Sequence, residues 1–281
     1  MRQKPLLLDG SMGALLMARG YDAAGCYLAN INNTAEITGI HKAYLAAGSD
    51  VILTNTFCVS DDIVYATKAS REDIILYAIE AAREACSAFP GKRIALDLSP
   101  SPLMVNPRKA PSPERIQEYF AEQIQIALGG VDLVFFETFS SSLELAEAVK
   151  AAKEISAAMP VYATMTFGTN RKTWLGDPLG SIQRVVDAGA DAVGCNCTLA
   201  PKAMAPLVEA MKALVKGKVP LIAEPNRGMP ETTPEGAAIY TMPAEEFAEG
   251  VVGLFEAGAD IIGGCCGSNP DCIRLIKKMV G

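Results

Sequence analysis

The residues of this sequence with the clearest chemical potential are its cysteines. There are eight of them: Cys26, Cys58, Cys86, Cys195, Cys197, Cys265, Cys266 and Cys272. The chain has one histidine, so chemistry that needs several histidines is excluded, and a metal ion must be held by cysteine, carboxylate or amide groups. Near the N-terminus only three leucines follow the basic residues, which is too short for an export signal. We therefore expect a cytoplasmic protein with reduced cysteines rather than a disulfide framework.

Three of the cysteines follow apolar runs that are typical of buried strands. Cys197 lies in the sequence GCNCT, and Cys265 and Cys266 lie in GGCCG. Adjacent residues of a regular strand point to opposite faces, so two neighbouring cysteines cannot both point inward from one. We expect the glycines around Cys265 and Cys266 to let the backbone leave strand geometry there. The three thiolates of Cys197, Cys265 and Cys266 can then converge on one ion.

Three soft sulfur ligands select zinc among the biological metals. A structural zinc site normally has four protein ligands, whereas three leave one position open for a substrate, as in catalytic sites. Zinc lowers the pKa of a bound thiol, so a thiol substrate would be held as thiolate at neutral pH. Three thiolates keep the bound sulfur electron-rich, which suits alkyl transfer to that sulfur better than activation of water. We therefore predict a catalytic zinc site that activates a small thiol for methyl transfer.

The rest of the chain repeats one pattern, in which a short apolar strand is followed by a longer amphipathic helix. Strands are predicted to begin at Leu6, Val51, Arg93, Leu133, Val161, Ala192, Pro220 and Ile261, and helices at Ala35, Arg71, Pro113, Ser142, Pro178, Pro201, Pro243 and Pro270. Eight such units predict an α/β fold, a (βα)8 TIM barrel that forms a single domain over residues 1–281. The alternative is an open doubly wound sheet, but the GxGxxG turn typical of that fold does not follow the first strand.

In a TIM barrel the active site lies where the strands end, at their carboxyl ends. The sixth and eighth strands have one strand between them, so Cys197, Cys265 and Cys266 are expected at neighbouring positions of this rim. Cys195 shares the strand face of Cys197 one pleat deeper, and we expect it to fill the barrel. Other polar residues are predicted at the same rim: Asp9, Asp97, Ser99, Glu137, Thr138, Asn196, Glu224 and Asn226. Three longer loops, 100–112, 168–177 and 227–242, follow strands and are expected over the mouth.

The charge and hydropathy of the chain argue against two classes of partner. The formal net charge is -7, and no cluster of basic residues suggests a surface for nucleic acid. No apolar run approaches the roughly 20 residues that span a membrane. We therefore expect a small-molecule substrate, with neither nucleic acid nor membrane as a partner.

The motifs DGSMG, TNTF, FFETF, MTF, GCNCT, EPN and GGCCG, in this order and spacing, resemble the homocysteine S-methyltransferase family. The closest likeness is to the homocysteine-binding barrel of cobalamin-dependent methionine synthases, and it runs from about Leu6 to the C-terminus. The resemblance implies a zinc-bearing barrel that methylates homocysteine to methionine. It implies that Cys197, Cys265 and Cys266 bind zinc, with Asn226 able to take the fourth position in the absence of substrate. It further implies that Asp9 and Glu137 hold the substrate ammonium, and that the backbone at Ser11 and Met12 meets its carboxylate.

The sequence departs from the family where a methyl donor would approach. The turn after the third strand reads SPSP, at Ser99 to Pro102, where the methionine synthase barrels usually carry GPTG; the second loop reads CVSDD, where GAT-type sequence is common. If methylcobalamin is the donor, we expect a separate corrinoid protein to supply it. Betaine or S-methylmethionine as a direct donor, another thiol or a selenol as acceptor, and a non-catalytic zinc- or thiol-binding barrel remain the alternatives.

Overall fold

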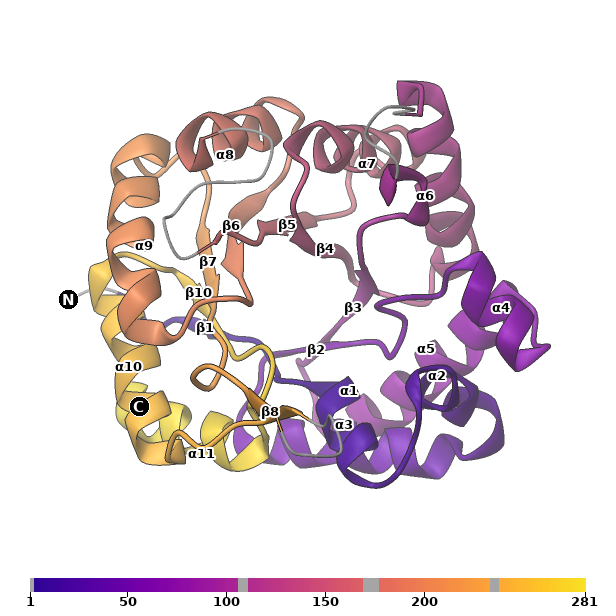
Figure 1. The fold of residues 1–281 in the computed structure, drawn as a ribbon, viewed down its shortest axis with the longest axis horizontal. Helices are drawn as coiled ribbons and strands as arrows, with labels where there is room; N and C mark the ends of the chain where they lie inside the picture. The colour runs from indigo at the N-terminus through magenta and orange to yellow at the C-terminus, as the bar shows by residue number, and fades with distance from the viewer. Residues whose placement is uncertain (1–2, 106–110, 169–176, 233–237) are drawn as a thin grey trace.

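The computed structural model describes residues 3–105, 111–168, 177–232 and 238–281. Its main element is a sheet of eight parallel strands in the order β1-β10-β7-β6-β5-β4-β3-β2. The strands are β1 (Leu6–Leu7), β2 (Val51–Leu53), β3 (Arg93–Leu98), β4 (Leu133–Phe139), β5 (Val161–Met165), β6 (Ala192–Asn196), β7 (Leu221–Glu224) and β10 (Ile261–Ile262). Each begins within one residue of its predicted position, and together they surround the centre of the molecule as the predicted TIM barrel (Figure 1).

The barrel closes where its first two strands meet. The Asp50 N–H donates a hydrogen bond to the Leu7 carbonyl over 2.7 Å. Above it, the carboxylate of Asp9 accepts a hydrogen bond from the Leu53 N–H over 3.0 Å. The Asp9 side chain thus accepts a hydrogen bond that a backbone carbonyl of a neighbouring strand would otherwise accept. This bond holds Asp9 at the carboxyl end of the barrel.

The outer layer consists of the eight predicted helices, which surround the strands (Figure 1). They are α3 (Thr34–Ala47), α5 (Arg71–Ser87), α6 (Pro113–Ala127), α7 (Ser142–Ile155), α8 (Pro178–Asp187), α9 (Pro201–Val215), α10 (Ala244–Ala257) and α11 (Pro270–Val280). Several begin with proline in the first turn, where its missing N–H costs nothing. The side chains of Ser112, Asp177 and Asn269 cap three of these helices by accepting a backbone hydrogen bond.

Further elements, which the sequence pattern did not predict, lie on the connections that follow barrel strands. They are α1 (Met12–Ala18), α2 (Ala23–Asn32), α4 (Asp61–Thr67), a 3-10 turn at Pro102–Val105, and a hairpin of β8 (Glu231–Thr232) and β9 (Ala238–Ile239). They are short, and α4 buries no residue, so they lack a long apolar stripe that would reveal them. Of the three loops predicted to cover the mouth, residues 106–110, 169–176 and 233–237 lie outside the described residues.

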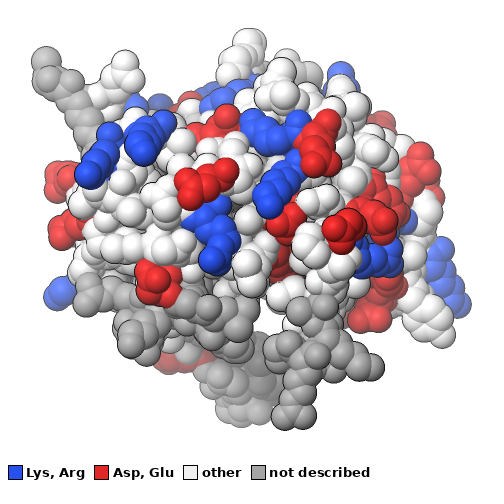
Figure 2. All heavy atoms as spheres, turned by 90° about the horizontal axis from the view of Figure 1, so that it is seen from above, with Lys and Arg blue, Asp and Glu red and all other residues white. Residues whose placement is uncertain are grey.

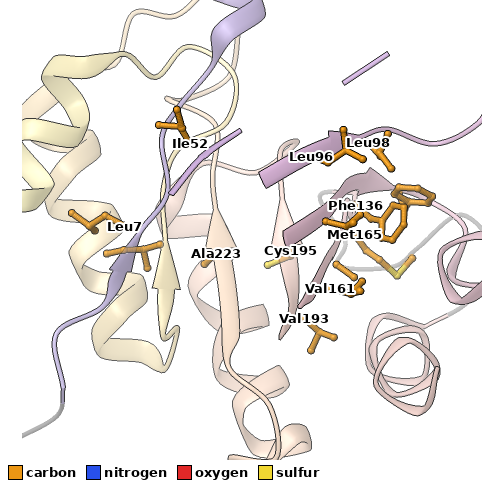
Figure 3. Packing of buried hydrophobic residues seen from close by; sticks show 14 of the residues in the cluster. Leu7, Ile52, Leu96, Leu98, Phe136, Val161, Met165, Val193, Cys195 and Ala223 are labelled. Atoms are coloured by element: carbon orange, nitrogen blue, oxygen red, sulfur yellow. The ribbon is translucent and has the colours of Figure 1, made fainter. Parts of the chain in front are cut away.

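Because successive residues of a strand point to opposite faces, the strand residues contribute alternately to two apolar clusters. The first cluster fills the barrel and includes Leu53, Phe135 and Ile222. The second cluster lies between the strands and the helices, and Figure 3 shows part of it. Cys195 belongs to the second cluster and is 1% exposed, so the prediction that it fills the barrel was wrong. On β6 the inward positions are therefore the even-numbered ones, which end at Asn196 rather than at a cysteine.

Acidic and basic side chains lie side by side on the surface. Figure 2 shows lysine and arginine side chains interspersed with acidic ones on one face of the molecule. Within the described residues, no helix combines the length and the apolar character needed to cross a membrane.

Candidate metal centre

The structure brings the sulfur atoms of Cys197, Cys265 and Cys266 together at the carboxyl ends of β6 and β10. The Sγ atom of Cys266 lies 3.8 Å from that of Cys197 and 3.9 Å from that of Cys265, and all three lie within 4.8 Å of one another. Zinc–sulfur bonds of about 2.3 Å in a tetrahedral arrangement place sulfur atoms about 3.8 Å apart. The predicted triad is therefore spaced as zinc ligands require.

Cys197 reaches this cluster because the backbone leaves strand geometry after Asn196. Cys197 and Thr198 have φ angles of 59° and 62°, in the left-handed region that costs a residue with a Cβ atom about 1–2 kcal/mol. The Cys197 N–H still donates to the Glu224 carbonyl over 2.9 Å, so the turn begins from a paired position. Unfavourable backbone of this kind persists where surrounding structure imposes it, and it is concentrated at functional sites.

The turn that carries Cys265 and Cys266 is held by the connection after β7. The Cys265 N–H donates to the Pro225 carbonyl over 2.9 Å, and the Arg227 N–H donates to the Cys266 carbonyl over 3.0 Å. Gly267 then has a φ of 82°, and a Cβ atom there would lie 2.2 Å from Cγ of Tyr240. Glycine is required at this position both for the left-handed turn and for the approach of the Tyr240 ring.

Asn226 supplies the best candidate for a fourth ligand. Its side chain is 5% exposed, and its Oδ1 atom has no hydrogen-bond partner among the described residues. The Asn226 side chain also contributes to lowering the pKa of Cys197, as expected for an amide beside the sulfur cluster. A buried amide oxygen without a partner is costly, and a metal ion next to the cysteines would satisfy it. The sulfur spacing and this oxygen together fit a zinc ion.

The three thiols are also linked to one another electrostatically. Hydrogen bonds from the Cys265 and Cys266 side chains lower the pKa of Cys197 far below that of an ordinary thiol. Hydrogen bonds with Cys197 and Cys266 raise the pKa of Cys265, to which burial also contributes. Negative charge is thus stabilised first on Cys197, which is the form in which cysteine binds metal.

Four carboxyl groups point toward the mouth from separate strands of the barrel: Asp9, Asp97, Glu137 and Glu224. Asp9, Asp97 and Glu224 are between 4% and 6% exposed, and burial is the main reason why the pKa of each is raised. Oδ1 of Asp97 and Oε2 of Glu224 have no hydrogen-bond partner in the described part of the chain. The strand pattern placed all four at the rim, and the family resemblance implied a substrate role only for Asp9 and Glu137. The inward strand positions that Asp97 and Glu224 share with Glu137 could have identified them.

Glu137 is the carboxyl group of this set that is linked to the cysteines through a shared partner, Asn196. Its Oε2 atom accepts hydrogen bonds from Asn196 Nδ2 over 2.5 Å and from the Thr138 hydroxyl over 3.2 Å. Burial, and next the charge on Cys197, raise the pKa of Glu137 to about 7. A cationic group that binds here would favour the ionised carboxylate, so the pocket suits an ammonium ion.

The turn at Ser11 and Met12 lies beside the same cluster, at the start of α1. The Ser11 side chain caps this helix by accepting from the Ala14 N–H over 3.2 Å. The Ser11 N–H donates to Ser268 Oγ over 3.3 Å, and the Ser268 hydroxyl donates to the Cys265 carbonyl over 2.7 Å. The backbone expected to meet a substrate carboxylate is therefore connected to the cysteine turn.

The SPSP turn, which departs from the family pattern, is held by a buried glutamate. The N–H and the hydroxyl of Ser101 both donate to Glu144 Oε1, over 2.8 and 2.6 Å. Glu144 is 1% exposed and lies in the first turn of α7. This fixes the start of the connection that follows β3.

Comparison with known proteins gives matches over nearly the whole chain. A family model described as homocysteine S-methyltransferase matches residues 6–280. The methionine synthase of Mycobacterium leprae is 28% identical over 302 residues, which cover 99% of this chain but 24% of that protein. The homocysteine S-methyltransferase 4 of Zea mays is 26% identical over 309 residues and is covered to 89% of its length. The chain thus spans about a quarter of one curated relative and most of another.

A solved structure shares the fold over nearly the whole chain. The metallated form of the homocysteine methyltransferase MmuM from Escherichia coli superposes with a TM-score of 0.78 at 21% identity. The match covers 99% of this chain and 97% of that one. At this identity the likeness concerns the fold, and it agrees with the TIM barrel described above.

Proposed function

Because the chain belongs to the homocysteine S-methyltransferase family, we propose that it transfers a methyl group to the thiolate of homocysteine, giving methionine, with zinc held by Cys197, Cys265 and Cys266. The observation that carries this proposal is the spacing of the three sulfur atoms beside a buried acidic pocket. One end of the site suits a thiol and the other an ammonium, as an amino-acid thiol requires.

The residues around the cysteines would bind and orient the substrate. We assign the ammonium to Glu137 and Asp9, since a positive charge there offsets the cost of burying these carboxylates. The backbone of Ser11 and Met12 is assigned to the substrate carboxylate. This arrangement would hold the amino-acid part and leave the thiol directed at Cys197, Cys265 and Cys266.

The chemistry at sulfur requires a thiolate that attacks a methyl group. Bound to the three cysteines, zinc would lower the pKa of the substrate thiol and keep its sulfur nucleophilic at neutral pH. Asn226 would occupy the fourth ligand position in the absence of homocysteine and yield it to the substrate sulfur. In the reaction the sulfur–methyl bond forms as the bond between the methyl group and its donor breaks.

We propose that a methyl-corrinoid protein acting in trans is the donor. The TNTF and EPN motifs resemble the cobalamin-dependent branch, and methionine synthases are among the relatives. Exposed large apolar side chains lie on the rim side of the barrel, which favours a protein partner there. Met17, Tyr65, Met229 and Ile239 lie on the connections that follow strands, and Leu143 lies in the first turn of α7. Betaine or S-methylmethionine as a direct donor is the alternative.

Replacement of Cys266 by alanine tests the zinc proposal. We expect the variant to lose both stoichiometric zinc and methylation of homocysteine, while Cys272→Ala, which removes a buried cysteine of α11, retains both. Full activity of a zinc-free Cys266→Ala variant would overturn the proposal.

A panel of donors and acceptors tests the remaining choices. Wild-type protein is offered homocysteine with a methyl-corrinoid protein, free methylcobalamin, betaine or S-methylmethionine, and methionine is measured. Replacing homocysteine by other thiols and a selenol tests the acceptor. Tight homocysteine binding without turnover from every donor would favour a non-catalytic thiol-binding barrel.

A further inference from the structure

Asn196 connects the sulfur cluster to the acidic pocket. It is the last residue of β6, its side chain is 0% exposed, and it points inward between the two groups. Its Nδ2 atom lies 2.5 Å from Oε2 of Glu137 and 3.8 Å from Sγ of Cys265. One amide thus faces a predicted zinc ligand and a predicted ammonium ligand at once.

The orientation of this amide is determined by the donors on its other side. The Thr138 N–H and the Thr164 hydroxyl each donate to Oδ1 of Asn196 over 2.8 Å. The oxygen must face these donors, so the NH2 group must face Glu137 and Cys265. Rotation of the amide by 180° would place two N–H groups against donors and leave the carboxylate against an oxygen.

The two hydrogens of this NH2 group have three acceptors. Nδ2 lies 2.5 Å from Oε2 of Glu137, 2.7 Å from the Thr138 hydroxyl oxygen and 3.8 Å from Sγ of Cys265. Thr138 has a φ of 63°, in the left-handed region. The side-chain oxygen of Asn196 accepts the hydrogen bond from the Thr138 N–H and so stabilises this turn. The side chain therefore orients the residue that follows Glu137 as well as Glu137 itself.

We propose that Asn196 is a positioning residue that couples the metal ligand Cys265 to the ammonium-binding carboxylate Glu137. Its N–H groups orient and stabilise both anions, as residues behind metal ligands commonly do. Loss of these N–H groups would weaken zinc retention and homocysteine binding together. This inference rests on the proposed function, because it assigns the effect to the zinc and ammonium halves of that site.

Two variants separate the N–H groups from the rest of the side chain. Asn196→Asp keeps an oxygen for the Thr138 N–H and the Thr164 hydroxyl but removes both N–H donors. Asn196→Ala removes all of these contacts. The matched control is Asn30→Ala, since Asn30 is also 0% exposed and its Nδ2 donates to the Asn55 and Ile74 carbonyls rather than to Cys265 or Glu137.

The measurements are the zinc dissociation constant by chelator competition, the absorption of the cobalt-substituted protein, and KM for homocysteine. We expect both Asn196 variants to raise the zinc dissociation constant and KM by about tenfold or more, as is usual for groups that orient metal ligands. Asn30→Ala should lower the melting temperature and leave both constants within twofold.

Zinc dissociation constants and KM values within twofold of wild type in Asn196→Asp would overturn the proposal, whatever its melting temperature. If Asn196→Ala fails to fold, the aspartate variant alone decides. Wild-type protein that binds neither zinc nor homocysteine would instead overturn the proposed function, so the two failures are distinguishable.

Discussion

Replacing His41 by leucine is expected to stabilise the protein, and increasingly so as the pH falls. His41 is the single histidine of the chain, is 0% exposed within α3, and has no partner for either ring nitrogen among the described residues. Burial lowers the pKa of His41 to about 3, so the folded protein holds the neutral ring. Leucine has a similar size and removes two buried polar atoms, each of which costs about 1–3 kcal/mol when unpaired.

The pH dependence follows from the difference between the folded and unfolded states. Unfolded His41 titrates near pH 6.5, so between pH 6.5 and 3 the unfolded chain binds one more proton than the folded one. The contribution of His41 to stability is therefore complete above pH 6.5 and is lost as the pH falls, by about 2 kcal/mol between pH 7 and pH 5 and by about 4 kcal/mol between pH 7 and pH 3. The leucine variant lacks this term, so its advantage over wild type should grow by about 2 kcal/mol between pH 7 and pH 5.

Urea unfolding of both proteins at pH 7 and pH 5 measures this change, because the titration of other groups cancels in the difference. The histidine signal in the NMR spectrum gives the pKa directly, since an untagged chain has one such ring. A pKa near 6.5, or an advantage of the leucine variant that stays constant with pH, would refute the reasoning. Either result would mean that a group or water molecule pairs with the ring.

Three further perturbations address the site. Glu137→Gln should raise KM for homocysteine about 10- to 100-fold, because a charge-assisted contact is lost. In the wild-type protein KM should fall as the pH rises through about 7, where Glu137 ionises. Steady-state kinetics as a function of pH would check both expectations. Gly267→Ala should lower the free energy of unfolding by about 1–3 kcal/mol and weaken zinc binding, because the added methyl group would collide with Tyr240 in a left-handed turn. The control Gly253→Ala lies in open space on α10 and should raise the free energy of unfolding, because alanine favours the helix over glycine. Urea titrations measure both changes. Asn226→Ala should weaken zinc binding by about tenfold without homocysteine and by less when homocysteine saturates the site, as measured by chelator competition; equal weakening in both conditions would contradict a displaceable fourth ligand.

The barrel could be predicted from the sequence because its evidence is local. Strands buried on both faces are continuous apolar runs, and prolines and capping residues mark where helices begin, so strand and helix starts were confirmed nearly to the residue. The short helices α1, α2 and α4 were missed because length and periodicity are what make a helix visible in a sequence. The grouping of Cys197 with Cys265 and Cys266 also followed from local evidence, once closure of the barrel put their strands one apart.

The tertiary structure decided the direction of each side chain at the rim and which residues lie next to it. Strand alternation alone predicted that Cys195 and Cys197 point into the barrel. In the structure Cys195 points toward the helices and Asn196 into the barrel, and Cys197 reaches the site through a left-handed φ. That conformation depends on hydrogen bonds to β7 and its connection, which no local pattern encodes. Closure of the barrel likewise brings Asp97 and Glu224 to the pocket of Glu137, because residues more than 30 positions apart meet only when the strands are placed side by side. Residue types thus predict a thiol-binding metal site, and packing determines which groups surround the three cysteines.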